Sequence, residues 1–120
     1  MPKTEVVYFA EDDGTAPVLD WLDRQETKVQ DKCLVRIERL GELGHELRRP
    51  EADYLRDGIY ELRVRYRSVN YRMLYFFGEG TAVVSHGLTK EDVVPDRDIA
   101  LAVRRKAKFE NDPEEHTYKE

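Results

Sequence analysis

The sequence predicts an α+β fold in which an antiparallel sheet of about four to five strands carries an N-terminal helical hairpin and a C-terminal helix. Three observations lead to this prediction. Segments of alternating side-chain character occupy residues 59–66, 70–77 and 81–90, and turn-forming residues separate them. An apolar stripe with helical spacing precedes these segments, and a proline-led helical segment follows them.

The N-terminal part is expected to form one strand and two helices. Residues 4–10 are apolar and β-branched, and Pro17 suits the first turn of a short helix. Thr27 and Gln30 have the spacing of a capping box, which would begin the second helix. The second helix would bury one apolar stripe: Val29, Cys33, Ile37 and Leu40.

The middle of the chain continues with a connection and the three alternating segments. A short strand is expected near Tyr54, and Asp57-Gly58 is a turn signal that would lead into the segment at 59–66.

Pro95 opens the last predicted helix, at about residues 96–110. One side of this helix would carry Ile99, Val103 and Ala107. We expect residues 1–110 to form a single domain. Residues 111–120 would form a polar C-terminal tail, mobile unless it docks on the domain.

The composition excludes several classes of protein. Cys33 is the only cysteine of 120 residues, which excludes an intrachain disulfide and a zinc site built on several thiolates. No apolar run approaches the ~18 residues of a membrane span, and the N-terminus lacks the pattern of a signal peptide. We therefore expect a cytoplasmic protein with no membrane partner.

Arginines are dense in residues 60–77 although the chain has a net charge of −5. Residues 55–75 hold five Arg against Asp57 and Glu61, so a basic patch is possible on an acidic protein. Strand side chains alternate between the two faces of a sheet. One face would carry Tyr60, Leu62, Val64 and Tyr66, against the helices, and the other Glu61, Arg63, Arg65 and Arg67.

The turn after this segment decides which arginines meet. A four-residue loop at 67–70 would place Arg65 opposite Arg72, and Arg63 would join them on the same face. A loop longer or shorter by two keeps this parity, whereas a bulge reverses it.

The following turn decides the place of the histidine. A three-residue turn at 78–80 would put His86 opposite Arg72, and Lys90 shares that parity. A two-residue turn would bring Ser85 to that face instead.

Like charges opposed across strands cost up to ~1 kcal/mol per pair, which suggests a compensating anion. The planar guanidinium fork suits phosphate, and Glu61 would offset part of the charge internally. The alternative interpretation is an ordinary solvated face of alternating arginines, with His86 as a structural residue.

The motifs "DGIYELRVRY", "YRMLYFF" and "VVSHGLTKE", with the proline-led final helix, resemble the RelE/HigB-like toxin superfamily, and most closely its phage-derived branch. The resemblance covers most of the chain. It implies a RelE-like fold and the toxin of a type II toxin–antitoxin module. It also implies a metal-independent, cofactor-free endoribonuclease (an mRNA interferase) that cuts messenger RNA, commonly on the ribosome, by attack of the ribose 2′-OH on the adjacent phosphate.

The resemblance assigns roles by position. Arg72 matches the recurrent active-site arginine of the family and would hold the scissile phosphate. Arg63 matches a basic position on the preceding strand, and Arg65 would support it. Lys90 falls at the basic position after the last strand, where it would hold phosphate or stabilise the leaving group. Arg67 is a further candidate RNA contact, at the turn.

The residue that transfers the proton stays open at this stage. Family members often use a Tyr or His near the C-terminal end, and none follows "LTKE" here. His86 and Glu61 are candidates on the arginine face. His116 and Tyr118, in the tail, would reach the site only if the tail folds back.

Three functions therefore remain to be distinguished. The first is the ribonuclease toxin, with mRNA, the ribosome and a cognate antitoxin, often a helix-turn-helix protein, as partners. The second is a toxin of the same fold that binds protein, as gyrase-poisoning relatives do. The third is a catalytically inactive homologue that keeps only antitoxin binding.

Overall fold

The computed structural model describes residues 3–89 and 92–120, which form three helices, a short 3-10 turn and five strands. The helices are α1 (Pro17–Asp23), α2 (Thr27–Leu43) and α3 (Asp96–Asn111), and the 3-10 turn η1 spans Gly44–Glu46. The strands are β1 (Glu5–Tyr8), β2 (Ala52–Arg56), β3 (Ile59–Tyr66), β4 (Val69–Gly78) and β5 (Thr81–Thr89). Within the described ranges, no helix is long and apolar enough to cross a membrane.

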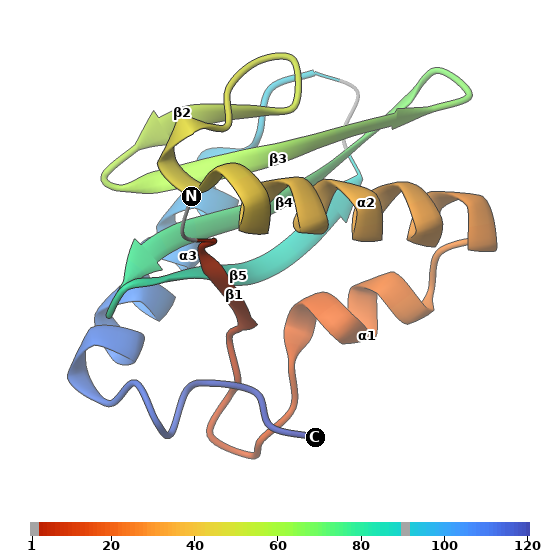
Figure 1. Cartoon of the computed structure of the whole chain (residues 1–120). Helices are drawn as coiled ribbons and strands as arrows, with labels where there is room; N and C mark the ends of the chain where they lie inside the picture. The colour runs from red at the N-terminus through yellow and green to blue at the C-terminus, as the bar shows by residue number, and fades with distance from the viewer. Residues whose placement is uncertain (1–2, 90–91) are drawn as a thin grey trace.

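The five strands form one sheet in the order β1-β5-β4-β3-β2 (Figure 1). All neighbouring strands are antiparallel except β1, which pairs in parallel with β5. The predicted α+β class is confirmed, although β1 pairs in parallel where an antiparallel sheet was expected.

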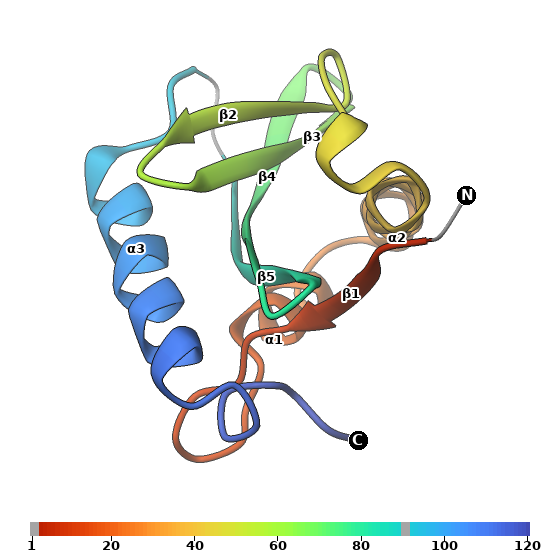
Figure 2. The same cartoon turned by 60° about the vertical axis from the view of Figure 1, so that its left-hand side comes forward.

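Helices cover both faces of the sheet. Figure 2 shows α3 on one side and the α1–α2 pair on the other. The α1–α2 side buries Leu62 and Val64 of β3, with Tyr60 and Tyr66 packed beside them, as the alternation predicted. The α3 side buries a second cluster around Leu74 and other apolar residues. The arginine face of β3 is therefore the face that α3 partly covers.

The β3–β4 turn has two residues rather than four. Arg67 and Ser68 form it with positive φ angles of 50° and 66°, the twist that suits a two-residue hairpin. Arg63 is consequently the residue opposite Arg72, and Arg65 lies opposite Asn70. The predicted pairing of Arg65 with Arg72 is wrong by two residues, which preserves the predicted face.

The β4–β5 turn also has two residues, Glu79 and Gly80, so the predicted three-residue turn is wrong. A two-residue turn alone would bring Ser85 to the α3 face. The register shifts between Leu74 and Tyr75, and this bulge returns His86 to that face, opposite Leu74 rather than Arg72.

The first turn of α2 lacks the side-chain cap that the sequence predicted. The capping-box prediction is wrong: Thr27 is already helical, and the N-cap position is Glu26, which makes no side-chain cap. Gln30 instead donates from Nε2 to the carbonyl of Leu22, at 2.9 Å, and so ties α2 to the end of α1. The predicted α2 stripe is buried in full.

Helix α3 begins after Pro95 as predicted but buries a different stripe. Its buried residues are Ile99, Ala102, Arg105 and Phe109, whereas Ala107 is exposed and Val103 is half-buried. The i, i+4, i+8 pattern therefore identified only the first residue of the buried face. The buried residues follow one another by three, three and four positions, so the buried face departs from the predicted stripe after Ile99.

The C-terminal tail docks on β1. Tyr118 N donates to Tyr8 O at 2.8 Å, and Ala10 N donates to His116 O at 2.9 Å. The His116 ring is buried and stacks on Phe9, with ring centroids 5.2 Å apart. The tail therefore lies at the β1 edge of the sheet, with β5 and β4 between it and β3.

Candidate functional site

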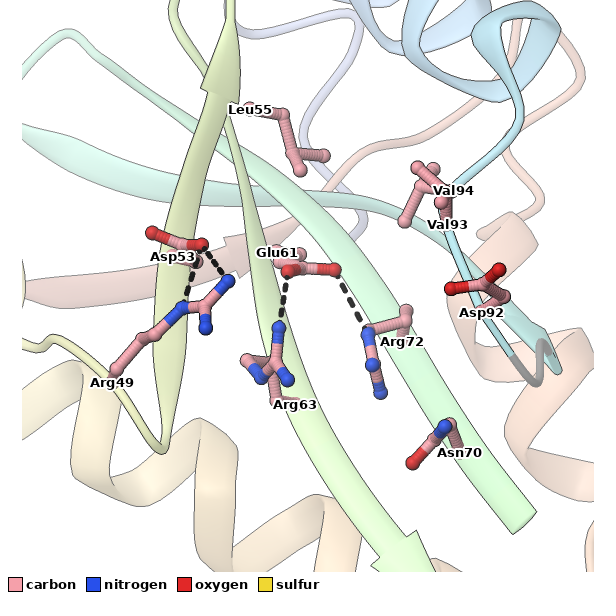
Figure 3. A pocket seen from close by; sticks show the side chains of 10 residues that line it. All are labelled: Arg49, Asp53, Leu55, Glu61, Arg63, Asn70, Arg72, Asp92, Val93 and Val94. Carbon is pink, nitrogen blue, oxygen red and sulfur yellow. Dashed lines mark hydrogen bonds and ion pairs between the residues drawn. The ribbon is translucent and has the colours of Figure 1, made fainter.

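A pocket of about 370 Å³ opens on the α3 side of the sheet, over β3 and β4. Figure 3 shows its lining side chains. Arg63, Arg72 and Glu61 form the floor, and the segment Asp92–Val94, which leads into α3, forms one wall. Arg49 and Asp53 form the opposite wall.

Glu61 joins the two facing arginines. Its Oε2 accepts a hydrogen bond from Arg63 Nη1 at 2.9 Å, and its Oε1 lies 2.9 Å from Arg72 Nε. The three residues meet for two reasons. Arg63 pairs directly with Arg72 across the hairpin, and Glu61 precedes Arg63 by two residues, so it lies on the same face of β3. Glu61 is 4 % exposed and Arg72 5 %, so this contact is largely shielded from water.

The charges of the floor are only partly balanced. One carboxylate faces two guanidinium groups, which leaves one positive charge in excess. Arg72 Nε is buried, and the carboxylate of Glu61 holds it in an ion pair. Burial lowers the pKa of Arg72 below its usual value, although Glu61 opposes that shift. An anion bound here would relieve the cost of the buried cation.

The walls add charges of both signs. Arg49 binds Asp53 through Nε and Nη2, each 2.9 Å from Asp53 Oδ2. Asp92 and Val93 are exposed at the opposite wall. The pocket therefore brings three arginines together with three carboxylates, and its apolar lining residues are Leu55, Val93 and Val94.

The remaining arginines of the hairpin lie outside this floor. Arg65 is exposed and donates to Asn70 Oδ1 over a long 3.4 Å. Arg67, in the turn, places its guanidinium carbon 5.2 Å from the centroid of the Tyr66 ring. Arg65 lines a neighbouring cavity rather than the pocket itself.

His86 shares the face of Arg72 but does not line the pocket. It is buried under α3, with Nδ1 2.8 Å from Ser85 Oγ and Nε2 3.2 Å from Asp98 Oδ1. Burial lowers the pKa of His86, and Arg105 adds to this effect while Asp98 opposes it. The geometry gives His86 a place in the contact between α3 and the sheet.

Two further predicted site residues, His116 and Tyr118, lie elsewhere. His116 donates from Nδ1 to the carbonyl of Ala10, 2.8 Å away, and Tyr118 pairs with β1. The docked tail therefore holds both away from the arginine pocket. Lys90 lies outside the described residues.

Sequence reasoning missed Arg49, Asp53 and Asp92. The Asp57-Gly58 turn signalled the β2–β3 hairpin but not the place of Asp53. The turn pairs Arg56 with Ile59, and it is the β-bulge between Tyr54 and Arg56 that puts Asp53 opposite Glu61. Asp92 had no such signal, since it reaches the pocket only through the path of the chain between β5 and α3.

The arrangement suits a phosphate diester. Two guanidinium groups fixed by one carboxylate present forked donors toward a space large enough for a nucleotide unit. Such preorganised cations stabilise negative charge that develops on phosphorus oxygens. Over residues 3–89 and 92–120, no cluster of three or more His, Cys, Asp and Glu side chains has the geometry of a metal site.

Comparison with known proteins agrees with the phage-derived branch of the resemblance. Residues 20–107 match the family model described as Phage derived protein Gp49-like (DUF891). The matched stretch contains every residue that lines the pocket. No curated protein matches the chain.

Proposed function

The chain belongs to the Gp49-like family of phage-derived proteins, a family associated with RelE/HigB-like toxins, and from this premise we propose that it is the toxin of a type II toxin–antitoxin module. We propose further that it is an endoribonuclease that cleaves messenger RNA on the ribosome. The observation that carries the proposal is the pair Arg63 and Arg72, which meet across β3 and β4 and share the carboxylate of Glu61 at the floor of a pocket.

In the proposed reaction the ribose 2′-oxygen forms a bond to phosphorus, and the bond from phosphorus to the 5′-oxygen breaks. A base takes the proton of the 2′-OH, and the leaving 5′-oxygen gains a proton. Arg72 and Arg63 bind the phosphate oxygens and stabilise the charge that grows on them. Glu61 is a positioning residue, because both of its oxygens contact arginines.

Proton transfer is assigned to the pocket wall. Asp92 is an exposed carboxylate that lines the pocket with Arg72, which makes it our candidate for the base. His86 contributes to α3 packing in this proposal. Lys90 keeps the role of binding phosphate or stabilising the leaving group, on the strength of the resemblance alone.

The test is growth inhibition by Arg72→Ala and Arg72→Lys, with Arg104→Ala as the matched control on the exposed side of α3. Loss of one preorganised donor typically costs about 10²–10³ in rate, so both Arg72 variants should lose growth inhibition while thermal unfolding shows a folded chain. Arg104→Ala should remain toxic. A fully toxic, folded Arg72→Ala protein would refute the mechanism.

One observation favours a second candidate, the catalytically inactive homologue. Among the described residues, neither a His nor a Tyr lines the pocket. The inactive homologue would fold normally, bind its antitoxin and leave both growth and messages unaffected. A protein-binding toxin of the gyrase-inhibitor type would instead damage DNA while messages stay intact.

The proposed partner is a cognate antitoxin, of the helix-turn-helix class in many such modules. Contact with the arginine face would block access to the pocket. A short neighbouring gene in the same direction that encodes a DNA-binding protein would support this partner.

A further inference from the structure

A second cavity, of about 300 Å³, adjoins the pocket at the open edge of β3. Four arginines line it, and no carboxylate does: Arg36, Arg63, Arg65 and Arg72. The pocket, in contrast, has as many carboxylates as arginines around it. The second cavity is therefore the more strongly positive of the two.

The edge of β3 is open here because β2 is short. The pairing of β2 with β3 ends at Ala52 and Leu62, and Arg63 N then donates to the carbonyl of Glu51 at 2.8 Å. In the described part of the chain, no strand pairs with residues 64–66 on that side. The cavity can thus pass round the edge of the sheet from the α3 side to α2.

Arg36 enters this cavity from α2, the layer on the other face. Its Nη1 lies 3.3 Å from Glu51 Oε2, but Arg39 holds the same carboxylate through two hydrogen bonds of 2.9 and 3.1 Å. Arg36 Nε is buried and has no hydrogen-bond partner among the described residues. Arg36 is therefore anchored by Glu51, while the exposed part of its side chain, 26 % of the whole, lines the cavity.

A third cavity, of about 310 Å³, continues the path over α2 and shares Arg36, Val64 and Arg65 with the second. Asp31, Lys32 and the exposed Val35 line it as well. Along the second and third cavities, cations and apolar side chains lie next to one another, with Asp31 as the one carboxylate in their linings. This combination suits a single-stranded nucleic acid, whose phosphates need cations and whose bases and sugars need apolar contact.

An RNA chain with its scissile phosphate at Arg72 must leave the pocket on both sides. Two sides carry carboxylates, Asp53 and Asp92, which repel phosphate. The side toward Arg65 and Arg36 carries only cations and neutral residues. Electrostatics therefore favour this side for the flanking backbone.

We propose that Arg36 and Arg65 form a second backbone-binding subsite, which takes the phosphate of single-stranded RNA next to the cleaved one as the strand passes round the edge of β3 toward α2. The proposal rests on the proposed function, since it takes the pocket at Arg72 as the place of the scissile phosphate. It adds Arg36, which no sequence motif indicated.

The test is binding of fully 2′-O-methylated RNA, which lacks the attacking hydroxyl, to the full-length protein. Fluorescence anisotropy would measure affinity for oligonucleotides from about three to about eight nucleotides long, at salt concentrations between about 50 and 200 mM. The variants are Arg36→Gln and Arg65→Gln. Lys28→Gln, an exposed position on α2 that lines none of the three cavities, removes the same charge as a control.

Each variant should lose roughly five- to tenfold in affinity for the longest RNA. Each should also reduce the dependence of log K on log salt by about 0.7, the value for one lost phosphate contact on a single strand. Wild-type affinity should rise with RNA length, and Lys28→Gln should match the wild type. Thermal unfolding would establish that the variants are folded, and the exposed Arg65 provides a site where substitution disturbs no buried contact.

Unchanged affinity and salt dependence in both variants would overturn the subsite, as would a wild type that fails to bind the longest RNA. The subsite would also be overturned if the two variants bound a Glu-rich peptide more weakly than the wild type does but bound RNA equally well. That result would favour an acidic protein segment as the ligand. These failures are separate from that of the proposed function, which the toxicity of Arg72→Ala decides.

Discussion

Replacing Glu61 by Gln should destabilise the protein and make it respond to phosphate. The carboxylate is almost fully buried and contacts both arginines of the pocket floor. The amide keeps the shape but removes the charge, so Arg63 and Arg72 would face each other across the strands without compensation.

The magnitude follows from the burial of each partner. Breaking a buried ion pair by removing one charge costs about 3–5 kcal/mol. Arg63 is 28 % exposed at its side chain and Gln retains one acceptor, so we expect a cost just below this range, about 2–3 kcal/mol. For a chain of this size each kcal/mol moves Tm by about 3–6 °C, which gives a decrease of about 10 °C.

Urea and thermal unfolding of Glu61→Gln would measure this loss, with Glu38→Gln, exposed on α2, as a control expected within about 0.5 kcal/mol of wild type. Inorganic phosphate should then raise Tm more in Glu61→Gln than in the wild type. An anion at ten times its Kd adds about 1.4 kcal/mol. A variant as stable as the wild type, with no larger response to phosphate, would refute the idea that Glu61 balances the two arginines.

Three other predictions concern the fold. Burial raises the pKa of the Cys33 thiol to about 12, so a thiol reagent should react with Cys33 only as fast as the chain unfolds; rapid labelling in native buffer would contradict its burial. Burial lowers the pKa of His86 in the folded protein. As the pH falls below about 6.5, His86 therefore becomes protonated in the unfolded chain before it does so in the folded chain. The wild type should therefore lose stability there, and His86→Gln should lose less; equal pH profiles would count against a buried neutral imidazole. Gly87→Ala would drive a methyl group into the Trp21 ring and should cost about 1–3 kcal/mol by urea unfolding; no loss would show that the ring can move aside.

The strands and their faces were predictable because the evidence for them is local. Period-two alternation placed Leu62 and Val64 against the helices and Glu61 and Arg63 on the opposite face. The error in the β3–β4 loop, four residues instead of two, changed the partners of the arginines but not their face, since a shift of two residues preserves parity. The error in the β4–β5 turn, three residues instead of two, would have moved His86 to the other face, and the β-bulge between Leu74 and Tyr75 returns it.

The registers were less accessible because non-glycine residues occupy positions that usually select glycine or asparagine. Arg67, Ser68 and Glu79 all have positive φ, and these residue types do not predict a two-residue turn. The bulge beside Ser85 is likewise invisible to an alternation rule, yet it decides where His86 points.

The parts of the site that sequence could not supply come from tertiary packing. Asp92 reaches the pocket from the connection before α3, and Arg36 reaches its edge from the opposite layer. The tail residues His116 and Tyr118 dock on β1, a contact between the two ends of the chain that no local pattern encodes. Local periodicity thus placed the centre of the site but not its walls.

Primer extension on cellular RNA after a short induction tests the central claim most directly. The account predicts new 5′ ends within messenger RNAs soon after the wild-type chain is produced, and none after production of a folded Arg72→Lys protein. Intact messages under the wild-type chain, or the same cleavage pattern from both proteins, would contradict an arginine-centred ribonuclease.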